Sequence, residues 1–161
     1  MASYTESIPA GGEGKVSLRV RTANYGGNLI VKHATVYTND PDNTTISLVI
    51  TGKVEKVAEI VPRQVLISGP AGAAIQKVVR ITPEEKYAFA VTNVMTQSGK
   101  YIDAKIEKTT YRGRPSYNLV VTNKMGKPGN YIDYIYVATD SKVEPRLRIR
   151  VRGTIFAPSG K

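Results

Sequence analysis

The last third of the chain repeats the residue pattern of the first third, at a shift of 101 positions and without a gap. Between residues 16 and 54 the two copies share five identical residues, which are Leu18, Val20, Val36, Thr38 and Gly52. Apolar residues recur at every second position in both copies, which is the pattern of strands with one buried face. A period of about a hundred residues is the usual length of one antiparallel β-sandwich domain. The repeat therefore predicts an all-β chain.

The repeat also predicts how the 161 residues divide into domains. Residues 55–156 form a complete copy, residues 1–54 correspond to the C-terminal half of an earlier copy, and residues 157–161 form a tail or linker. Half of a sandwich cannot close its own core. We expect the chain to be a piece of a longer protein, because Met1-Ala-Ser resembles an added start. The alternative is that the N-terminal strands pack on the second domain or on another copy in a homodimer.

Individual strands can be placed from the alternation and from the turn formers between them. The first half-copy has three expected strands, at 15–22, 29–38 and 46–54. The complete copy has seven, at 64–67, 76–81, 88–95, 102–109, 116–122, 130–139 and 146–156. Seven short strands with a turn signal about every ten residues predict an immunoglobulin-like antiparallel β-sandwich.

The composition excludes several classes of site. The chain has no cysteine and one histidine, His33, so disulfides, thiolate metal sites and multi-histidine metal sites are ruled out. No apolar stretch reaches the roughly 20 residues that cross a bilayer as a helix. The carboxylate pair Glu84-Glu85 comes without a predicted apolar cleft to raise a pKa. We therefore expect no catalytic residue, no metal, no cofactor and no enzymatic activity.

The net charge of +10 is concentrated in the complete copy, where residues 55–161 carry 18 Lys or Arg against nine Asp or Glu. The strongest basic motif places Arg146, Arg148, Arg150 and Arg152 at alternate positions of one expected strand. Alternation puts the four guanidinium groups on one face, about 6.8 Å apart. Such a row can bind the phosphates, sulfates or carboxylates of an anionic polymer. The alternative is a solvated outer face whose charge keeps the sheet soluble.

Tyrosine is the second unusual feature, with ten tyrosines and no tryptophan. Tyr134 and Tyr136 have the same parity on the preceding strand, so both rings are expected on one face. Aromatic rings beside arginines can stack on bases or sugars or anchor a protein interface, although tyrosine is also simply a good strand former. Nucleic acid is the less favoured ligand, because an RNA-binding fingerprint, zinc-finger spacing and a basic recognition helix are all lacking.

Three segments of the first copy resemble a known family. Ile8-Pro-Ala-Gly-Gly-Glu-Gly-Lys15, Val36-Tyr-Thr-Asn-Asp-Pro41 and Leu48-Val-Ile-Thr-Gly52 resemble the C-terminal half of the bacterial domain of unknown function 1573, a module akin to Hydin and major sperm protein domains. The resemblance implies a seven-stranded immunoglobulin-like sandwich and a periplasmic or cell-surface location. Many members carry a Ser-Cys-Gly-Cys segment, which is absent where it would fall, around 94–96. The resemblance therefore implies no redox or metal-binding role for this chain.

The sequence leads to two hypotheses about function. The first is a non-catalytic immunoglobulin-like binding or spacer module of a larger, repetitive bacterial protein, whose partner is another protein or an anionic surface polymer. The alternative is polyanion or nucleic-acid binding through the arginine row and the two tyrosines.

Overall fold

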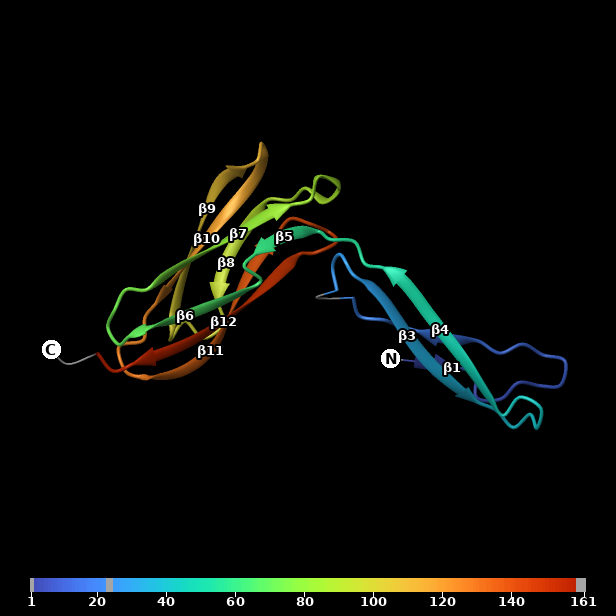
Figure 1. The fold of residues 1–161 in the computed structure, drawn as a ribbon. Coiled ribbons are helices and arrows are strands. Elements are labelled where there is room, and N and C mark those ends of the chain that lie inside the picture. Colours follow the sequence, from blue (N-terminus) through green and yellow to red (C-terminus); the bar gives the residue numbers. More distant parts are fainter. Residues whose placement is uncertain (1, 23–24, 159–161) are drawn as a thin grey trace. The chain divides into compact units, whose positions relative to one another are not determined.

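The computed structural model describes residues 2–22 and 25–158, and the chain divides into two compact units, Met1–Glu55 and Lys56–Lys161 (Figure 1). We call them the N-terminal unit and the C-terminal unit. The described regular structure consists of strands and of one short 3-10 helix, η1 (Glu85–Tyr87). The all-β prediction is therefore confirmed.

The C-terminal unit is a sandwich of two four-stranded sheets. One sheet has the order β5 (Ala58–Val61), β7 (Gln76–Pro83), β10 (Arg114–Asn123) and β9 (Ile102–Tyr111), with every pair antiparallel. The other has the order β6 (Gln64–Pro70), β12 (Arg146–Phe156), β11 (Gly129–Thr139) and β8 (Val91–Thr96), in which only β6 and β12 run parallel. This is the strand arrangement of a constant-type immunoglobulin domain, with the first strand divided between the two sheets. The predicted sandwich is confirmed.

β5 was not among the strands expected from the sequence, which began the complete copy with a strand at 64–67. Pro62 and Arg63 separate β5 from β6. Because proline lacks a backbone N–H, it cannot continue the ladder. The chain therefore leaves β7 in one sheet and joins β12 in the other.

The core lies between the two sheets and is formed by the inward residues of the alternating strands. β12 shows the alternation over its whole length, with every second residue buried. The central aliphatic side chains are fully buried, and they are Val79, Ile81, Leu119, Val121, Ile135, Val137, Ile149 and Val151.

A tyrosine at the start of β11 closes one end of this core. The hydroxyl of Tyr131 donates to Oδ1 of Asn123 at 3.0 Å, and its ring stacks on Tyr101 with the centroids 5.1 Å apart. The ring lies over Gly153, where an added Cβ would be 2.0 Å from Cε1 of Tyr131. This close packing requires a glycine at position 153.

Burial of the phenol, with a smaller contribution from the charge of Asp133, raises the pKa of Tyr131 to about 12.

The chain enters and leaves the C-terminal unit at opposite ends. β5 begins at Ala58, which pairs with Pro83 at the end of β7. β12 finishes at Phe156, whose carbonyl accepts from the N–H of Ala71 in the turn that leads to the start of β7. The entry at β5 therefore lies beside the end of β7, and the exit after β12 lies near the start of β7. The length of β7 separates the entry from the exit, so the chain enters and leaves this unit at opposite ends.

The N-terminal unit has two separate two-stranded sheets. β1 (Ala2–Tyr4) pairs with β2 (Val16–Leu18), and β3 (Leu29–Tyr37) pairs with β4 (Thr45–Lys53), both antiparallel. The three strands expected at 15–22, 29–38 and 46–54 correspond to β2, β3 and β4, and β1 is a fourth strand that was not predicted. With three residues and only exposed side chains, β1 carries no alternation that a sequence could reveal.

The β3–β4 hairpin has the same pairing as β11–β12. Leu29 pairs with Lys53, and the residues 101 positions later, Asn130 and Thr154, pair in the same way. Each of the other β3–β4 pairs also has its equivalent in β11–β12. The hairpin therefore has the register of the last two strands of a sandwich.

The turns of the two hairpins are held by equivalent side-chain hydrogen bonds. Oγ1 of Thr38 donates to the carbonyl of Asn43, and Oγ1 of Thr139 donates to the carbonyl of Glu144, both at 2.7 Å. Each threonine Oγ1 also accepts from the N–H two residues later. Thr38 and Thr139, identical in the two copies, thus make the same turn.

Candidate anion-binding face

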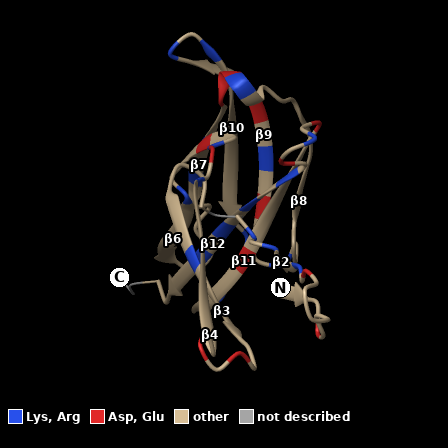
Figure 2. Ribbon diagram, turned by 90° about the vertical axis from the view of Figure 1, so that its right-hand side faces the viewer, with Lys and Arg blue, Asp and Glu red and all other residues tan. Residues whose placement is uncertain are grey.

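The predicted arginine row lies on β12, in the β6-β12-β11-β8 sheet. Figure 2 marks the positions of Lys and Arg along the ribbon in blue. Arg146, Arg148, Arg150 and Arg152 are all exposed, while the residues between them are buried. Leu147 is 7% exposed, and Ile149 and Val151 are fully buried. The strand's own alternation therefore holds four cations on one face.

Two tyrosines of β11 lie beside the arginines, as the strand parity indicated. Tyr136 pairs with Arg148 and Tyr134 with Arg150 in the β11–β12 ladder. The guanidinium group of Arg146 lies 4.9 Å from the ring centroid of Tyr136, and that of Arg148 lies 5.2 Å from the centroid of Tyr134. These are cation–π distances. We call the outward side chains of the four arginines and two tyrosines the basic face.

The tyrosines are themselves held in place. The hydroxyl of Tyr136 donates to Oε1 of Gln97 at 3.0 Å, and the N–H of Gln97 donates to the carbonyl of Tyr134 at 2.8 Å. The chain that follows β8 therefore fixes the edge of the basic face and orients the ring on which Arg146 stacks.

The sheet that carries the basic face has one carboxylate in its four described strands, and it points inward. Asp133 is 2% exposed. Its side chain accepts from the backbone N–H of Ser98 and of Tyr134 and from the Ser98 hydroxyl. The outward positions of β6, β8, β11 and β12 carry no acidic residue. The charge of the four arginines is thus not neutralised within the described sheet.

The basic face also has an apolar border that the sequence analysis missed. Leu66 on β6 pairs with Arg152 and is 62% exposed, and Met95 on β8 pairs with Tyr136 and is 53% exposed. Ile132 pairs with Arg152 from the other side and is also exposed. The register of β6 and β8 against β12 and β11 was needed to place these residues.

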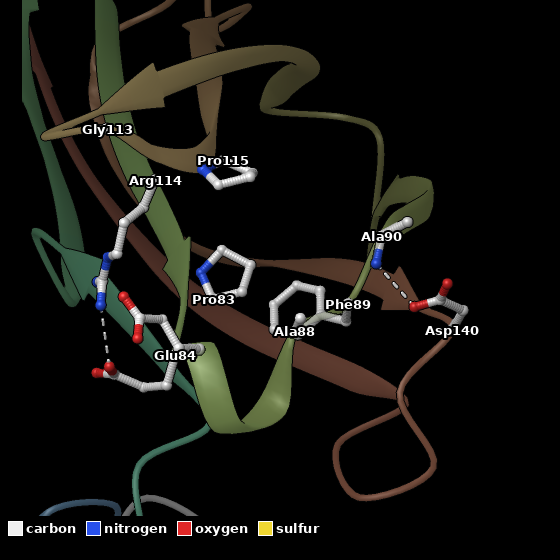
Figure 3. A pocket seen from close by; sticks show the side chains of 10 residues that line it. Pro83, Glu84, Ala88, Phe89, Ala90, Gly113, Arg114, Pro115 and Asp140 are labelled. Carbon is white, nitrogen blue, oxygen red and sulfur yellow. Dashed lines mark hydrogen bonds and ion pairs between the residues drawn. The ribbon is translucent and has the colours of Figure 1, made fainter.

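A hollow of about 570 Å³ lies elsewhere in the C-terminal unit (Figure 3). It brings Glu84 and Glu85 beside Phe89 and Arg114, so these carboxylates do border a concave surface that the sequence did not predict. Glu84 is paired with Arg114 at 3.3 Å. Oδ1 of Asp140 accepts from the N–H of Ala90 at 2.7 Å. Three of the charged side chains around the hollow are therefore engaged in bonds that join β7, β8, β10 and the loop after β11.

The described residues contain no group of three or more His, Cys, Asp or Glu side chains placed to hold a metal ion. No helix in the described part of the chain is long and apolar enough to cross a membrane.

Comparison with known proteins adds a distant structural likeness. No protein-family model matches the chain, and no curated protein matches it. Among solved structures, the chain is similar to the extracellular cadherin domains 1–4 of protocadherin gamma B7, with a TM-score of 0.41 and 8% sequence identity. The match covers 96% of this chain and 40% of that one.

Proposed function

We propose that the C-terminal unit is a non-catalytic binding module that holds an anionic polymer on its basic face. The observation that carries this proposal is the row of four exposed arginines on a sheet surface without an outward carboxylate. Solubility alone does not require an outer face with only positive charges, because a mixture of positive and negative side chains keeps a sheet soluble equally well.

The geometry of the arginines favours ligand binding. A guanidinium group that stacks on a ring uses its π-face, while its N–H donors lie in its plane. The stacking of Arg146 on Tyr136 and of Arg148 on Tyr134 therefore restrains the side chains and leaves donors for phosphate, sulfate or carboxylate oxygens. Less side-chain entropy is then lost when the ligand binds.

The same positions of the N-terminal unit provide an internal comparison. The residues 101 positions before the arginines are Thr45, Ser47, Val49 and Thr51, all exposed. The outer face of this hairpin is therefore formed without arginine. The row is a property of the C-terminal unit and not a requirement of the strand, which supports a specific role.

The wider setting follows from the connections and from the family resemblance. The two ends of the C-terminal unit lie apart, as an array of domains in series requires. Membership of the domain of unknown function 1573 family, and with it a place in a larger bacterial protein at the periplasm or cell surface, stays a proposal. In that setting the ligand is an anionic surface polysaccharide.

The test compares three proteins in binding to an anionic bacterial polysaccharide, heparin and single-stranded DNA. They are the parent, a variant with Arg146, Arg148, Arg150 and Arg152 all changed to Ser, and a control with exposed Lys77, Lys105, Lys108 and Lys127 all changed to Ser. Both variants lose four positive charges. We expect the arginine variant to lose binding and the lysine control to keep it.

The salt dependence gives the expected magnitude. For single strands log K falls with log salt at about 0.7 per neutralised phosphate, so four contacts predict a slope of roughly −2.8. Equal losses in the two variants would show that only the net charge matters and would contradict the proposal. Tighter binding of DNA than of either polysaccharide would keep the basic face as the site and replace the proposed ligand.

A further inference from the structure

The N-terminal unit exposes apolar side chains that are buried in the C-terminal unit. Ten core residues of β10, β11 and β12 are between 0% and 7% exposed, and they are Tyr117, Leu119, Val121, Tyr131, Ile135, Val137, Leu147, Ile149, Val151 and Ile155. Their equivalents 101 positions earlier are all apolar, and they are Val16, Leu18, Val20, Ile30, Ala34, Val36, Ile46, Leu48, Ile50 and Val54. We call these ten residues the apolar face.

The apolar face is less covered than the equivalent residues of the C-terminal unit. Among its ten residues only Ile30 is buried, at 7% exposed, while Val16 and Ile46 are 40% and 43% exposed and the rest are half-buried. Neighbouring aliphatic residues exposed in this way are typical of an interaction site.

The strand edges of the N-terminal unit are open as well. In the C-terminal unit the second edge of β10 pairs with β7, that of β11 with β8 and that of β12 with β6. β2, β3 and β4, which occupy the equivalent places, each pair with one neighbour in the described structure. Within the described residues, β2, β3 and β4 therefore each have one edge without a paired strand.

We propose that the apolar face of the N-terminal unit docks a polypeptide segment that supplies the equivalents of β5, β6, β7 and β8. Strand addition to open edges is an established mode of protein recognition, in which the backbone provides hydrogen bonds and alternate side chains fill the pockets. The matching register of β3–β4 and β11–β12 shows that the hairpin is already set to receive strands in this arrangement.

A second copy of the chain is the less suitable occupant. Its own β5 to β8 are already paired within the two sheets of its C-terminal unit. Its N-terminal unit could cover the apolar face, but it would leave the edges of β2, β3 and β4 unpaired. A segment with the pattern of β5 to β8 satisfies both requirements, because it buries the face and completes the ladders.

The chain itself provides the probe for this proposal. A copy of residues 56–102 placed directly before Ala2 restores the 101-residue period, because residue 103 is the equivalent of residue 2. Hydrogen exchange is then measured on the extended chain and on the parent. We expect amides on the outer edges of β3 and β4 to exchange at least roughly 100-fold more slowly in the extended chain, as in closed sheets.

Two controls separate docking from mere tethering. An extension in which the copies of Val79 and Ile81 are changed to Ser should give no protection. Within the extended chain, Ile50→Ser on the apolar face should abolish the protection, whereas Val49→Ser, at an outward position that is 55% exposed, should leave it. Equal effects of Ile50→Ser and Val49→Ser would overturn the proposal.

A second measurement avoids dependence on the folding of the extended chain. A peptide of residues 56–102 is added to the parent, and the backbone amides are followed by NMR. A saturable shift of β3 and β4 resonances supports the proposal. The proposal is overturned if these resonances do not move. It is also overturned if the parent alone sediments as a dimer whose β3 and β4 edges are protected, because a second copy then occupies the apolar face.

Discussion

Replacing Gly153 by alanine should destabilise the C-terminal unit strongly. The added Cβ would be 2.0 Å from Cε1 and 2.1 Å from Cζ of Tyr131, whereas ordinary contacts are 3.4–4 Å. The ring cannot move away freely, because its hydroxyl bonds Asn123 and its face stacks on Tyr101. The substitution must therefore displace the ring or part the two strands.

The size of the effect follows from these contacts. Overpacking of a core costs about 1–3 kcal/mol, and a buried hydrogen bond that is lost with its partner left unsatisfied costs about 1–3 kcal/mol. We expect the free energy of unfolding to fall by about 2–6 kcal/mol. For a domain of this size the melting temperature should fall by at least about 8 °C.

Gly52 is the matched control, because it lies 101 positions earlier and an added Cβ there meets nothing within 4 Å. Gly52→Ala should change stability by no more than about 1 kcal/mol, and removal of a flexible glycine from a strand acts in the stabilising direction.

The assay is urea unfolding of both variants, followed by far-UV circular dichroism and by tyrosine fluorescence. Tyr131→Ile, which reproduces the residue found at position 30, should relieve much of the defect in the Gly153→Ala background, so the two substitutions should be non-additive. An unchanged midpoint for Gly153→Ala, or equal losses for the two glycine variants, would refute the close-packing argument.

Two other predictions concern the core and its titration. Burial raises the pKa of Tyr131 to about 12, from an ordinary value of 10.0, so the folded state holds the phenol proton more tightly than the unfolded state. The resulting contribution to stability is complete below pH 10 and is lost as pH rises towards 12. Urea midpoints across this pH range should therefore decline less steeply in Tyr131→Phe than in the parent, and an equal decline would contradict the raised pKa. Ile149→Ala, at a fully buried position, should lower the free energy of unfolding by about 2–5 kcal/mol. Leu48→Ala, at the half-buried equivalent position, should lower it clearly less when both variants are compared with the parent by calorimetry. Equal losses would show that the apolar face is already covered.

The long strands could be predicted from the sequence because their alternation extends over many residues. The stretch 146–156 matches β12, and the expected strand at 130–139 differs from β11 by one residue at its start. The missed strands are short or lack alternation. β1 has three exposed residues, and β5 has four residues of which three are half-buried, so neither produces a pattern that separates it from a loop.

The candidate site shows the same dependence on local information. Strand parity alone placed Arg146 to Arg152 on one surface and Tyr134 and Tyr136 beside them, because alternation is a property of a single strand. The apolar border at Leu66 and Met95 depends on how separate strands pair, and the hollow beside Glu84 depends on how turns from several strands meet. Neither can be read from one segment.

The most direct test of the central claim is to map the ligand on the protein by NMR. Isotope-labelled chain is titrated with a heparin-derived or bacterial anionic oligosaccharide, and the arginine Nε–H and backbone amide resonances are followed. We expect the largest shifts on Arg146, Arg148, Arg150, Arg152 and the neighbouring amides of β11. Shifts concentrated on the lysines of β9 and the loops, with the β12 arginines unchanged, would contradict it.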